Sequence, residues 1–222
     1  MKVKIPEATI MRMSVYSRFL ADLDRKDIIM ISSFDIAERV GVSPVQVRKD
    51  FSLFGEFGKR GVGYNVKELH WQILKILSLD ASWSVALVGL GNLGSALSSY
   101  KGFHERGLII TSIFDNNPGK IGTFINNVEI LPMDKLVEVV KYNQTQIGII
   151  SVPSEYAQEI ANLLVEGGVQ AILNFAPVVL NLPREIKLRN VDVTVNLEIL
   201  TFNSVKIFGE IKRPHNEPLF FA

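Results

Sequence analysis

The sequence of 222 residues contains no cysteine. This absence excludes disulfide bonds, thiolate nucleophiles, cysteine-based zinc sites and thiol redox switches. Histidine is almost as scarce, and the three histidines, His70, His104 and His215, are too scattered in the sequence to suggest a metal cluster. We therefore expect no metal site and no chemistry that depends on a protein thiol.

Long apolar runs are absent as well. No run reaches the about 18–20 residues that a membrane-spanning helix needs, and the first residues lack the apolar core of a signal peptide. We therefore expect a cytoplasmic protein that has no membrane partner.

The composition is that of a globular chain, with 47% hydrophobic and 21% charged residues. The formal net charge of +1 hides an uneven distribution. Residues 1–80 contain 13 Lys and Arg against 10 Asp and Glu, whereas residues 81–222 contain 11 against 13. The first part is therefore the mildly basic one, and it is where a nucleic-acid partner would bind.

Residues 1–80 predict a helical domain that is interrupted once by glycine. Ser43 followed by Pro44 marks a helix start, as an N-cap and a first helical residue. Residues 55–64 contain four glycines and two basic residues, which is typical of a β-hairpin or loop. Helix, turn, helix and a Gly-rich basic segment in this order match a winged helix-turn-helix. The four predicted helices begin near Pro6, Ser32, Ser43 and Asn65.

The helix that begins at Ser43 would enter the major groove of DNA with its N-terminal half. Gln46 and Lys49 share one face with Ser43, and these side chains can read adenine and guanine. Lys59 and Arg60 in the Gly-rich segment would reach phosphates or a minor groove. The competing interpretation of this half is a helical dimerisation domain with a solvated basic loop.

From residue 83 onward, apolar strands alternate with helices, which predicts a parallel sheet covered by helices on both faces. We expect an α/β Rossmann domain over residues 81–196. The predicted strands cover 83–90, 108–114, 147–152 and 171–175, and the predicted helices cover 93–106, 132–142 and 155–166.

A dinucleotide motif opens this second half. The pattern G-x-G-x-x-G at Gly89, Gly91 and Gly94 follows an apolar strand and starts a helix, and Asp115 ends the next strand. The three glycines permit a tight turn, a close approach of the pyrophosphate and close helix packing, while Asp115 accepts hydrogen bonds from a ribose. Its charge would repel the 2′-phosphate of NADP, so NAD is preferred, although the nearby Lys120 weakens that preference. The alternatives are a Rossmann fold without a ligand and one that holds another nucleotide, such as coenzyme A.

The C-terminal segment, residues 197–222, contains a stretch that is apolar on every side, from Leu197 to Ile211. A helix with this pattern must be buried all round. A single small domain rarely does this at its end, so a partner subunit is the natural explanation.

Several segments resemble the Rex family of redox-sensing repressors. In the first half these are residues 42–51, VSPVQVRKDF, and residues 55–64, GEFGKRGVGY, together with Ile5–Thr9 and Arg12. In the second half the resemblance holds for residues 89–97 with Tyr100, for 114–115, for 152–153 and for 173–177. It covers nearly the whole chain.

This resemblance implies a transcriptional repressor that forms a homodimer by exchanging its C-terminal helix. It implies binding to palindromic double-stranded operator DNA, release by NADH, and DNA binding that NAD+ permits or favours. Tyr100 and Asp192 match positions that the family couples to the switch. Val193 stands where some members have an aromatic residue next to the nicotinamide, so the nicotinamide pocket is expected to differ there.

Motifs and resemblance together define the expected sites. The residues expected to bind NAD(H) are Gly89, Leu90, Gly91, Asn92, Leu93, Gly94, Asp115, Lys120, Val152, Pro153, Asn174, Phe175 and Ala176. The residues expected to contact DNA are Thr9, Arg12, Ser43, Gln46, Arg48, Lys49, Lys59, Arg60, Gly61 and Tyr64.

The main rival function is that of an NAD-dependent oxidoreductase. Such an enzyme needs an acid/base group and a substrate pocket. His104 is expected on a helix surface, His70 lies outside the Rossmann half and His215 lies in the tail. The second half is expected to form one Rossmann domain without a second substrate domain. We therefore expect no enzyme. A structural helical protein with a vestigial nucleotide fold is a third reading, but it leaves the Gly-rich basic segment unexplained.

Overall fold

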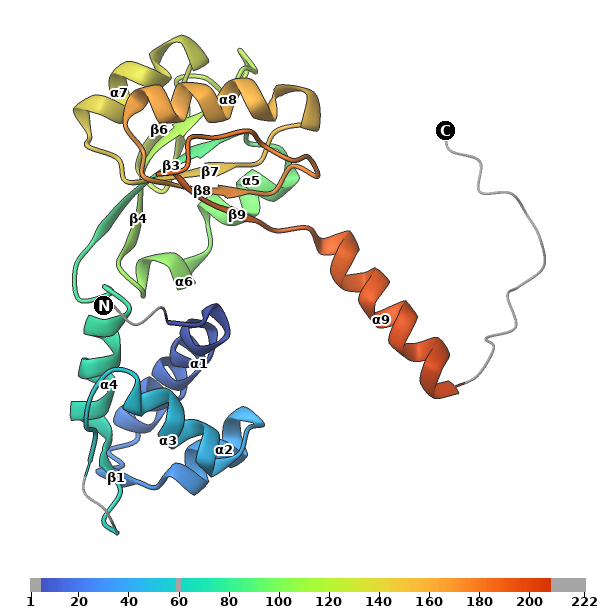
Figure 1. Ribbon diagram of the computed structural model, residues 1–222. Coiled ribbons are helices and arrows are strands. Elements are labelled where there is room, and N and C mark those ends of the chain that lie inside the picture. Colours follow the sequence, from blue (N-terminus) through green and yellow to red (C-terminus); the bar gives the residue numbers. More distant parts are fainter. Residues whose placement is uncertain (1–4, 59–60, 209–222) are drawn as a thin grey trace. The chain divides into compact units, whose positions relative to one another are not determined.

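A computed structural model of the protein describes residues 5–58 and 61–208, with side chains as far as Ser204. Two of the expected DNA contacts, Lys59 and Arg60, lie outside the described residues. The chain forms two compact units (Figure 1). One comprises Met1–Ser82 with Gly102–Gly107, and the other comprises Trp83–Lys101 with Leu108–Ala222. Within the described part, no helix is long and apolar enough to cross a lipid bilayer.

The first unit is a helical domain with a very small sheet. Local sequence explains where its helices begin. The hydroxyl of Ser32 accepts from the backbone N–H of Asp35 in a capping box, and the side chains of Ser43 and Asn65 accept from N–H groups of the following turns. The helices are α1 (Glu7–Asp24), α2 (Ser33–Val40), α3 (Pro44–Ser52) and α4 (Val66–Ile76).

The Gly-rich segment is a loop rather than a hairpin in its described part. The strand that follows it, β2 (Tyr64–Asn65), pairs antiparallel with β1 (Met30–Ile31), which precedes α2. Gly63 has φ of 97°, and a Cβ there would lie 2.6 Å from the carbonyl oxygen of Ile31. Only glycine therefore permits the segment to approach β1 this closely.

A buried carboxylate connects α1 to α3. Asp50 is 0% exposed. Its two oxygens accept hydrogen bonds from the guanidinium of Arg12, both at 2.6 Å, and from the hydroxyl of Tyr16 at 2.8 Å. The amide of Gln46 donates at 2.8 Å and the hydroxyl of Thr9 at 3.4 Å. The charge is therefore fully hydrogen-bonded, as burial of an ion requires.

The second unit is built on a seven-stranded sheet in the order β5-β6-β4-β3-β7-β8-β9. All neighbours are parallel except β5 and β6, and the order from β6 to β9 is that of a dinucleotide-binding fold. The strands are β3 (Trp83–Val88), β4 (Leu108–Phe114), β5 (Phe124–Ile125), β6 (Val128–Leu131), β7 (Ile147–Ile150), β8 (Ala171–Asn174) and β9 (Lys187–Asn190).

Helices cover both faces of this sheet. Figure 1 shows α7 (Leu136–Tyr142) and α8 (Ser154–Gly167) together on one face and α5 (Asn92–Ser98) on the other. The buried side chains of α7 and α8 form one apolar core with β3, β4, β7 and β8. This arrangement confirms the expected α/β class with an N-terminal helical domain.

Three features differ from the sequence-based expectation. The predicted helix 93–106 is wrong as a single helix, because α5 ends at Ser98 and a separate short α6 covers Lys101–His104. The hydroxyl of Ser98 donates to the carbonyl of Ser95, a local bond that competes with helix continuation. The strands β5, β6 and β9 were not predicted. A short 3-10 helix, η1 (Met133–Lys135), precedes α7.

The C-terminal helix α9 spans Val193–Phe208 and begins four residues before the predicted start at Leu197. Asp192 caps it, since its carboxylate accepts from the backbone N–H groups of Thr194 at 2.8 Å and Val195 at 3.3 Å. Its apolar side chains are exposed on several sides, with Leu197 59% and Leu200 60% exposed. The structure does not describe the side chains of four further residues of the predicted apolar stretch, Val205, Ile207, Phe208 and Ile211.

We predict that Asp50→Asn lowers the free energy of unfolding at pH 7 by about 3–5 kcal/mol, because it removes one partner of a buried ion pair. Burial by itself raises the pKa of Asp50, but hydrogen bonds from Arg12, Tyr16 and Gln46 outweigh it and hold that pKa below its usual value. Such a carboxyl contributes stability above the unfolded-state pKa, and the contribution is lost as the pH falls through the folded-state pKa.

Urea unfolding at a series of pH values below neutrality measures both effects. The stability of Asp50→Asn should fall less steeply with acid than that of the wild type. Asp80→Asn, which changes an exposed carboxylate, is the matched control and should follow the wild-type curve. Parallel curves for Asp50→Asn and wild type would contradict the prediction.

Candidate functional site

The three glycines after β3 have different geometric tasks. Gly89 has φ of 93°, and a Cβ there would lie 2.7 Å from the carbonyl oxygen of Ser151. A Cβ on Gly94 would collide with the carbonyl oxygen of Gly89, so the start of α5 packs directly on the end of β3. A Cβ on Gly91 would meet nothing within 4 Å. The backbone at Gly91 is therefore open to a ligand at the N-terminal end of α5.

Asp115 and Lys120 hold this loop from the neighbouring strand end. One oxygen of Asp115 accepts from the backbone N–H of Leu90 at 2.6 Å, and the other accepts from that of Asn117 at 2.8 Å. The ammonium of Lys120 donates to the carbonyl of Leu90 at 2.6 Å and lies 3.7 Å from Asp115. Both residues expected to bind the cofactor thus also shape the glycine loop.

A cavity of about 420 Å³ opens beside the glycine loop. It brings together seven of the expected cofactor-binding residues from three strand ends. Sequence reasoning missed the rest of its wall. The expected residues that line it are Gly89, Leu90, Gly91, Asp115, Lys120, Val152 and Pro153, and the missed ones are Asn116, Asn117, Met133, Ser151, Tyr156, Glu159, Ile160 and Leu163.

The remaining expected residues do not line the cavity. Asn92, Leu93 and Gly94 form the start of α5, and Phe175 and Ala176 follow β8. Asn174 is fully buried, and its amide bonds the backbone of Ala176 and Val178 and the side chain of Asn190. Asn174 therefore fixes the loop after β8, and its expected contact with the cofactor stays a prediction.

The exposed face of α3 is the candidate DNA-reading surface. Val45 is 64% exposed, and Arg48 and Lys49 on the same side of the helix are exposed as well. Ser43 is exposed but its hydroxyl caps the helix through the N–H of Gln46 at 3.1 Å. Of these residues, only Val45 was not among the expected contacts, and its spacing of four from Lys49 would have indicated it.

Three expected DNA contacts also have a structural task. Thr9 is 2% exposed, and Thr9, Arg12 and Gln46 all direct their side chains to Asp50. Thr9 is thus enclosed within the domain, and the amide of Gln46 donates to the buried carboxylate. The expected contacts of these three residues with DNA stay predictions.

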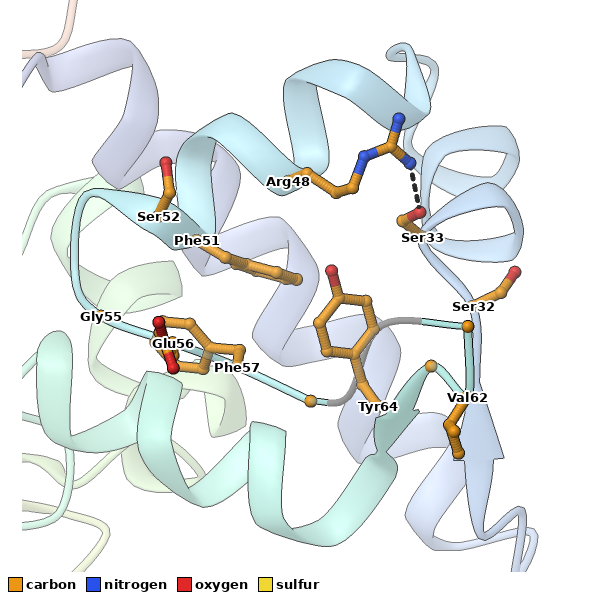
Figure 2. A pocket seen from close by; sticks show the side chains of 13 residues that line it. Ser32, Ser33, Arg48, Phe51, Ser52, Gly55, Glu56, Phe57, Val62 and Tyr64 are labelled. Atoms are coloured by element: carbon orange, nitrogen blue, oxygen red, sulfur yellow. Dashed lines mark hydrogen bonds between the residues drawn. The ribbon is translucent and has the colours of Figure 1, made fainter.

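A cavity of about 830 Å³ lies between α3, the N-terminal end of α2 and the Gly-rich segment (Figure 2). Arg48 projects across it, and its guanidinium donates to the hydroxyl of Ser33 at 2.8 Å. The ring of Tyr64 is packed edge-on against Phe51, with its hydroxyl directed toward α3. Burial raises the pKa of Tyr64, partly offset by the charge of Arg48. Gly61 also lines the cavity.

The two expected switch residues are both accessible. Tyr100 lies between α5 and α6 and is 59% exposed. Asp192 is half-buried at the end of β9, where it caps α9.

Comparison with known proteins agrees with this division. Residues 4–52 match the family described as putative DNA-binding protein N-terminus, and residues 80–178 match the CoA binding domain family. The chain is 73% identical to the redox-sensing transcriptional repressor Rex of Desulfitobacterium hafniense over 90% of this chain and 96% of the relative. It is 40% identical to Rex of Streptomyces coelicolor over 93% of this chain and 80% of the relative.

This chain belongs to the Rex family of redox-sensing transcriptional repressors.

Solved structures of Rex proteins are similar over nearly the whole chain. The structure of RSP in complex with β-NAD+ and operator DNA is 36% identical, with a TM-score of 0.88 and coverage of 92% of this chain and 94% of that one. RSP in complex with β-NADH is 34% identical with a TM-score of 0.82, covering 91% and 95%. The fold resemblance thus extends across both units of this Rex protein.

The glycine geometry predicts that Gly94→Ala and Gly91→Ala differ in stability. Gly94→Ala forces a methyl group against the backbone of Gly89, and overpacking of this kind costs about 1–3 kcal/mol. Gly91 has φ of −64°, which alanine adopts, and has space for a methyl group. Gly91→Ala should therefore unfold at nearly the wild-type temperature. Calorimetry without nucleotide measures this, and equal melting temperatures for the two variants would contradict it.

Proposed function

We propose that this chain is a DNA-binding repressor that senses the NADH/NAD+ ratio, binds palindromic operators and is released by NADH. One observation carries the proposal: a single Rex-family chain joins a basic helix-turn-helix surface to an open glycine-loop cavity. The similarity to a relative solved with both β-NAD+ and operator DNA supports it. The helix-turn-helix would supply sequence recognition, and the cavity would supply the redox input.

The cavity fits an NAD-type dinucleotide. The open backbone at Gly91 and the N-terminal end of α5 would hold the pyrophosphate, and Asp115 would accept from the adenosine ribose. The carboxylate of Asp115 favours NAD(H) over the 2′-phosphorylated form, with Lys120 as a partial counterweight. The cofactor supplies a ring that differs by one hydride and one charge between its two states.

In this proposal the cofactor is read and not consumed. Hydride transfer to a substrate needs an acid/base group close to the reacting carbon. No histidine lines the described walls of the cavity, but Lys120, Tyr156 and Glu159 do, so the lining alone does not separate a sensor from an enzyme. The similarity to redox-sensing transcriptional repressors favours the sensor over the rival oxidoreductase.

For operator recognition, Lys49 would contact a base edge, and Val45 next to it would contact a thymine methyl group. Arg48 and the cavity between α3 and the Gly-rich segment would accommodate a DNA strand. We keep Lys59 and Arg60, which follow Gly58 in the sequence, as proposed DNA contacts. Phosphate contacts of this kind set position, while the base contacts set sequence.

We also propose a homodimer in which α9 is exchanged between subunits. A helix with exposed Leu197, Ile199 and Leu200 requires an apolar partner. Two copies of the helix-turn-helix would then face two half-sites of one palindrome.

The decisive measurement is an operator titration by fluorescence anisotropy at several NADH/NAD+ ratios. Operator affinity should fall 5–150-fold as NADH replaces NAD+, which corresponds to a coupling free energy of about 1–3 kcal/mol. By reciprocity, operator DNA should weaken NADH binding by the same factor. A flat response across all ratios would leave a constitutive DNA-binding protein.

Two variants sharpen that titration. Lys49→Ala should cost about 1–3 kcal/mol of operator binding at every ratio, because it acts on the base contact and not on the switch. Asp192→Asn removes the charge but keeps a residue that caps a helix equally well. It should blunt the NADH response, as should Tyr100→Phe, while DNA binding in NAD+ persists.

The dimer proposal predicts that removal of residues 197–222 yields monomers or aggregates. Leu200→Glu places a charge in the exchanged apolar surface and should weaken association in the full chain. Thr201→Glu, at a polar neighbour, tests the effect of charge alone. Light scattering coupled to size exclusion measures the mass, and a monodisperse dimer from the truncated chain would overturn the proposal.

A further inference from the structure

One side of α8 lines the nucleotide cavity. Tyr156, Glu159, Ile160 and Leu163 all line it. Their spacing of three, four and seven residues places them on one stripe of the helix. The adjacent stripe, with Ala157, Ala161 and Leu164, is buried against the sheet. The first stripe therefore forms a wall of the cavity, and the second fixes its position.

The other groups that line the cavity indicate what this wall faces. The glycine loop is suited to a pyrophosphate and Asp115 to the ribose attached to it. The remaining lining, which includes the α8 wall, would then face the base of that nucleotide. Its lining combines the apolar side chains of Met133, Ile160 and Leu163 with the ring of Tyr156 and the carboxylate of Glu159.

This combination has a definite chemical preference. The apolar side chains and an aromatic ring accept the flat face of any base. An ionised carboxylate is an acceptor only, so it favours a base with an amino group at its edge and disfavours a carbonyl oxygen at the same place. Adenine carries an exocyclic amine at C6, whereas hypoxanthine and guanine carry an oxygen there.

We propose that α8 selects adenine: Tyr156 packs on the base, and Glu159 accepts a hydrogen bond from its exocyclic amine. Glu159 is a specificity-determining residue and Tyr156 supplies affinity that does not depend on the identity of the base. The inference rests on the proposed NAD(H) binding and adds which wall of the cavity recognises the base and how.

The test compares NADH with its hypoxanthine analogue, reduced nicotinamide hypoxanthine dinucleotide, by calorimetry on the full chain. Wild type should bind NADH about tenfold more tightly, the lower end expected for a hydrogen bond to a charged group because Glu159 is exposed. Glu159→Gln presents an amide that can donate or accept. It should bring the two dissociation constants to within about twofold.

Matched variants separate the two roles. Glu155→Gln changes another exposed glutamate one turn earlier on α8, outside the cavity, and should keep the wild-type preference. Tyr156→Ala should weaken both nucleotides by about the same factor of ten, because stacking tolerates either base. Tyr142→Ala, at an exposed tyrosine of α7, should leave both affinities unchanged.

The outcomes distinguish this inference from the proposed function. NADH binding with no preference over the hypoxanthine analogue would overturn the inference alone, as would a preference that persists in Glu159→Gln. Absence of NADH binding in wild type would overturn the proposed sensor and the inference with it. A preference that is lost in Glu159→Gln and kept in Glu155→Gln would establish it.

Discussion

The buried carboxylate of Asp50 is the constraint on which the DNA-reading surface depends. It lies on the inner side of α3, and a charge in that position is tolerated only because Arg12 and Tyr16 of α1 hydrogen-bond to it. The same bonds fix the rotation of α3 about its axis. With Val47, Asp50 and Phe51 turned inward, the opposite face with Arg48 and Lys49 faces outward. The orientation of the reading face is thus set from inside the domain.

The shape of the nucleotide site is also fixed by charged side chains, which here hydrogen-bond to backbone groups. Asp115 and Lys120 bond the N–H and the carbonyl of Leu90, so the loop between Gly89 and Gly91 is held from both sides. Gly89 and Gly94 let this loop pack without side chains, and among these three glycines Gly91 alone has space for a Cβ. The ligand-binding surface is therefore a backbone whose shape is fixed before any nucleotide arrives, which lowers the entropic cost of binding.

Local signals account for what the sequence could predict. Ser43 with Pro44 marks α3, and glycines after an apolar strand mark the nucleotide loop, because the causes lie within a few neighbouring residues. The hairpin of β5 and β6 was not predicted. The signal for it in the sequence is the pair Asn126-Asn127, because asparagine tolerates the positive φ that both residues adopt in this two-residue turn. Strand β9 was not predicted because the sequence from Lys187 to Asn190 has no alternation of apolar and polar residues.

Roles that depend on distant partners could not be predicted in this way. Thr9, Arg12 and Gln46 were expected to contact DNA from their position and chemistry. Asp50, which accepts hydrogen bonds from all three, is about 40 residues away in sequence from Thr9 and Arg12. Asn174 and Asn190 meet only once β8 and β9 pair. Helix α8 carries two adjacent stripes, one lining the cavity and one packed on the sheet, which a helical periodicity shows as a single amphipathic pattern. Only the sheet order decides which stripe faces a ligand.

The position of Asp192 connects the two halves of the proposed switch in energetic terms. Its carboxylate satisfies two backbone N–H groups at the start of α9, and an N-cap of this kind contributes about 0.5–2 kcal/mol. The coupling needed for a 5–150-fold change in operator affinity is about 1–3 kcal/mol. The two quantities are of the same size. A redox-dependent contact that drew the Asp192 carboxylate from its cap would therefore change the free energy of α9, the proposed dimer element, by as much as the response requires. Neither core would have to rearrange on a large scale.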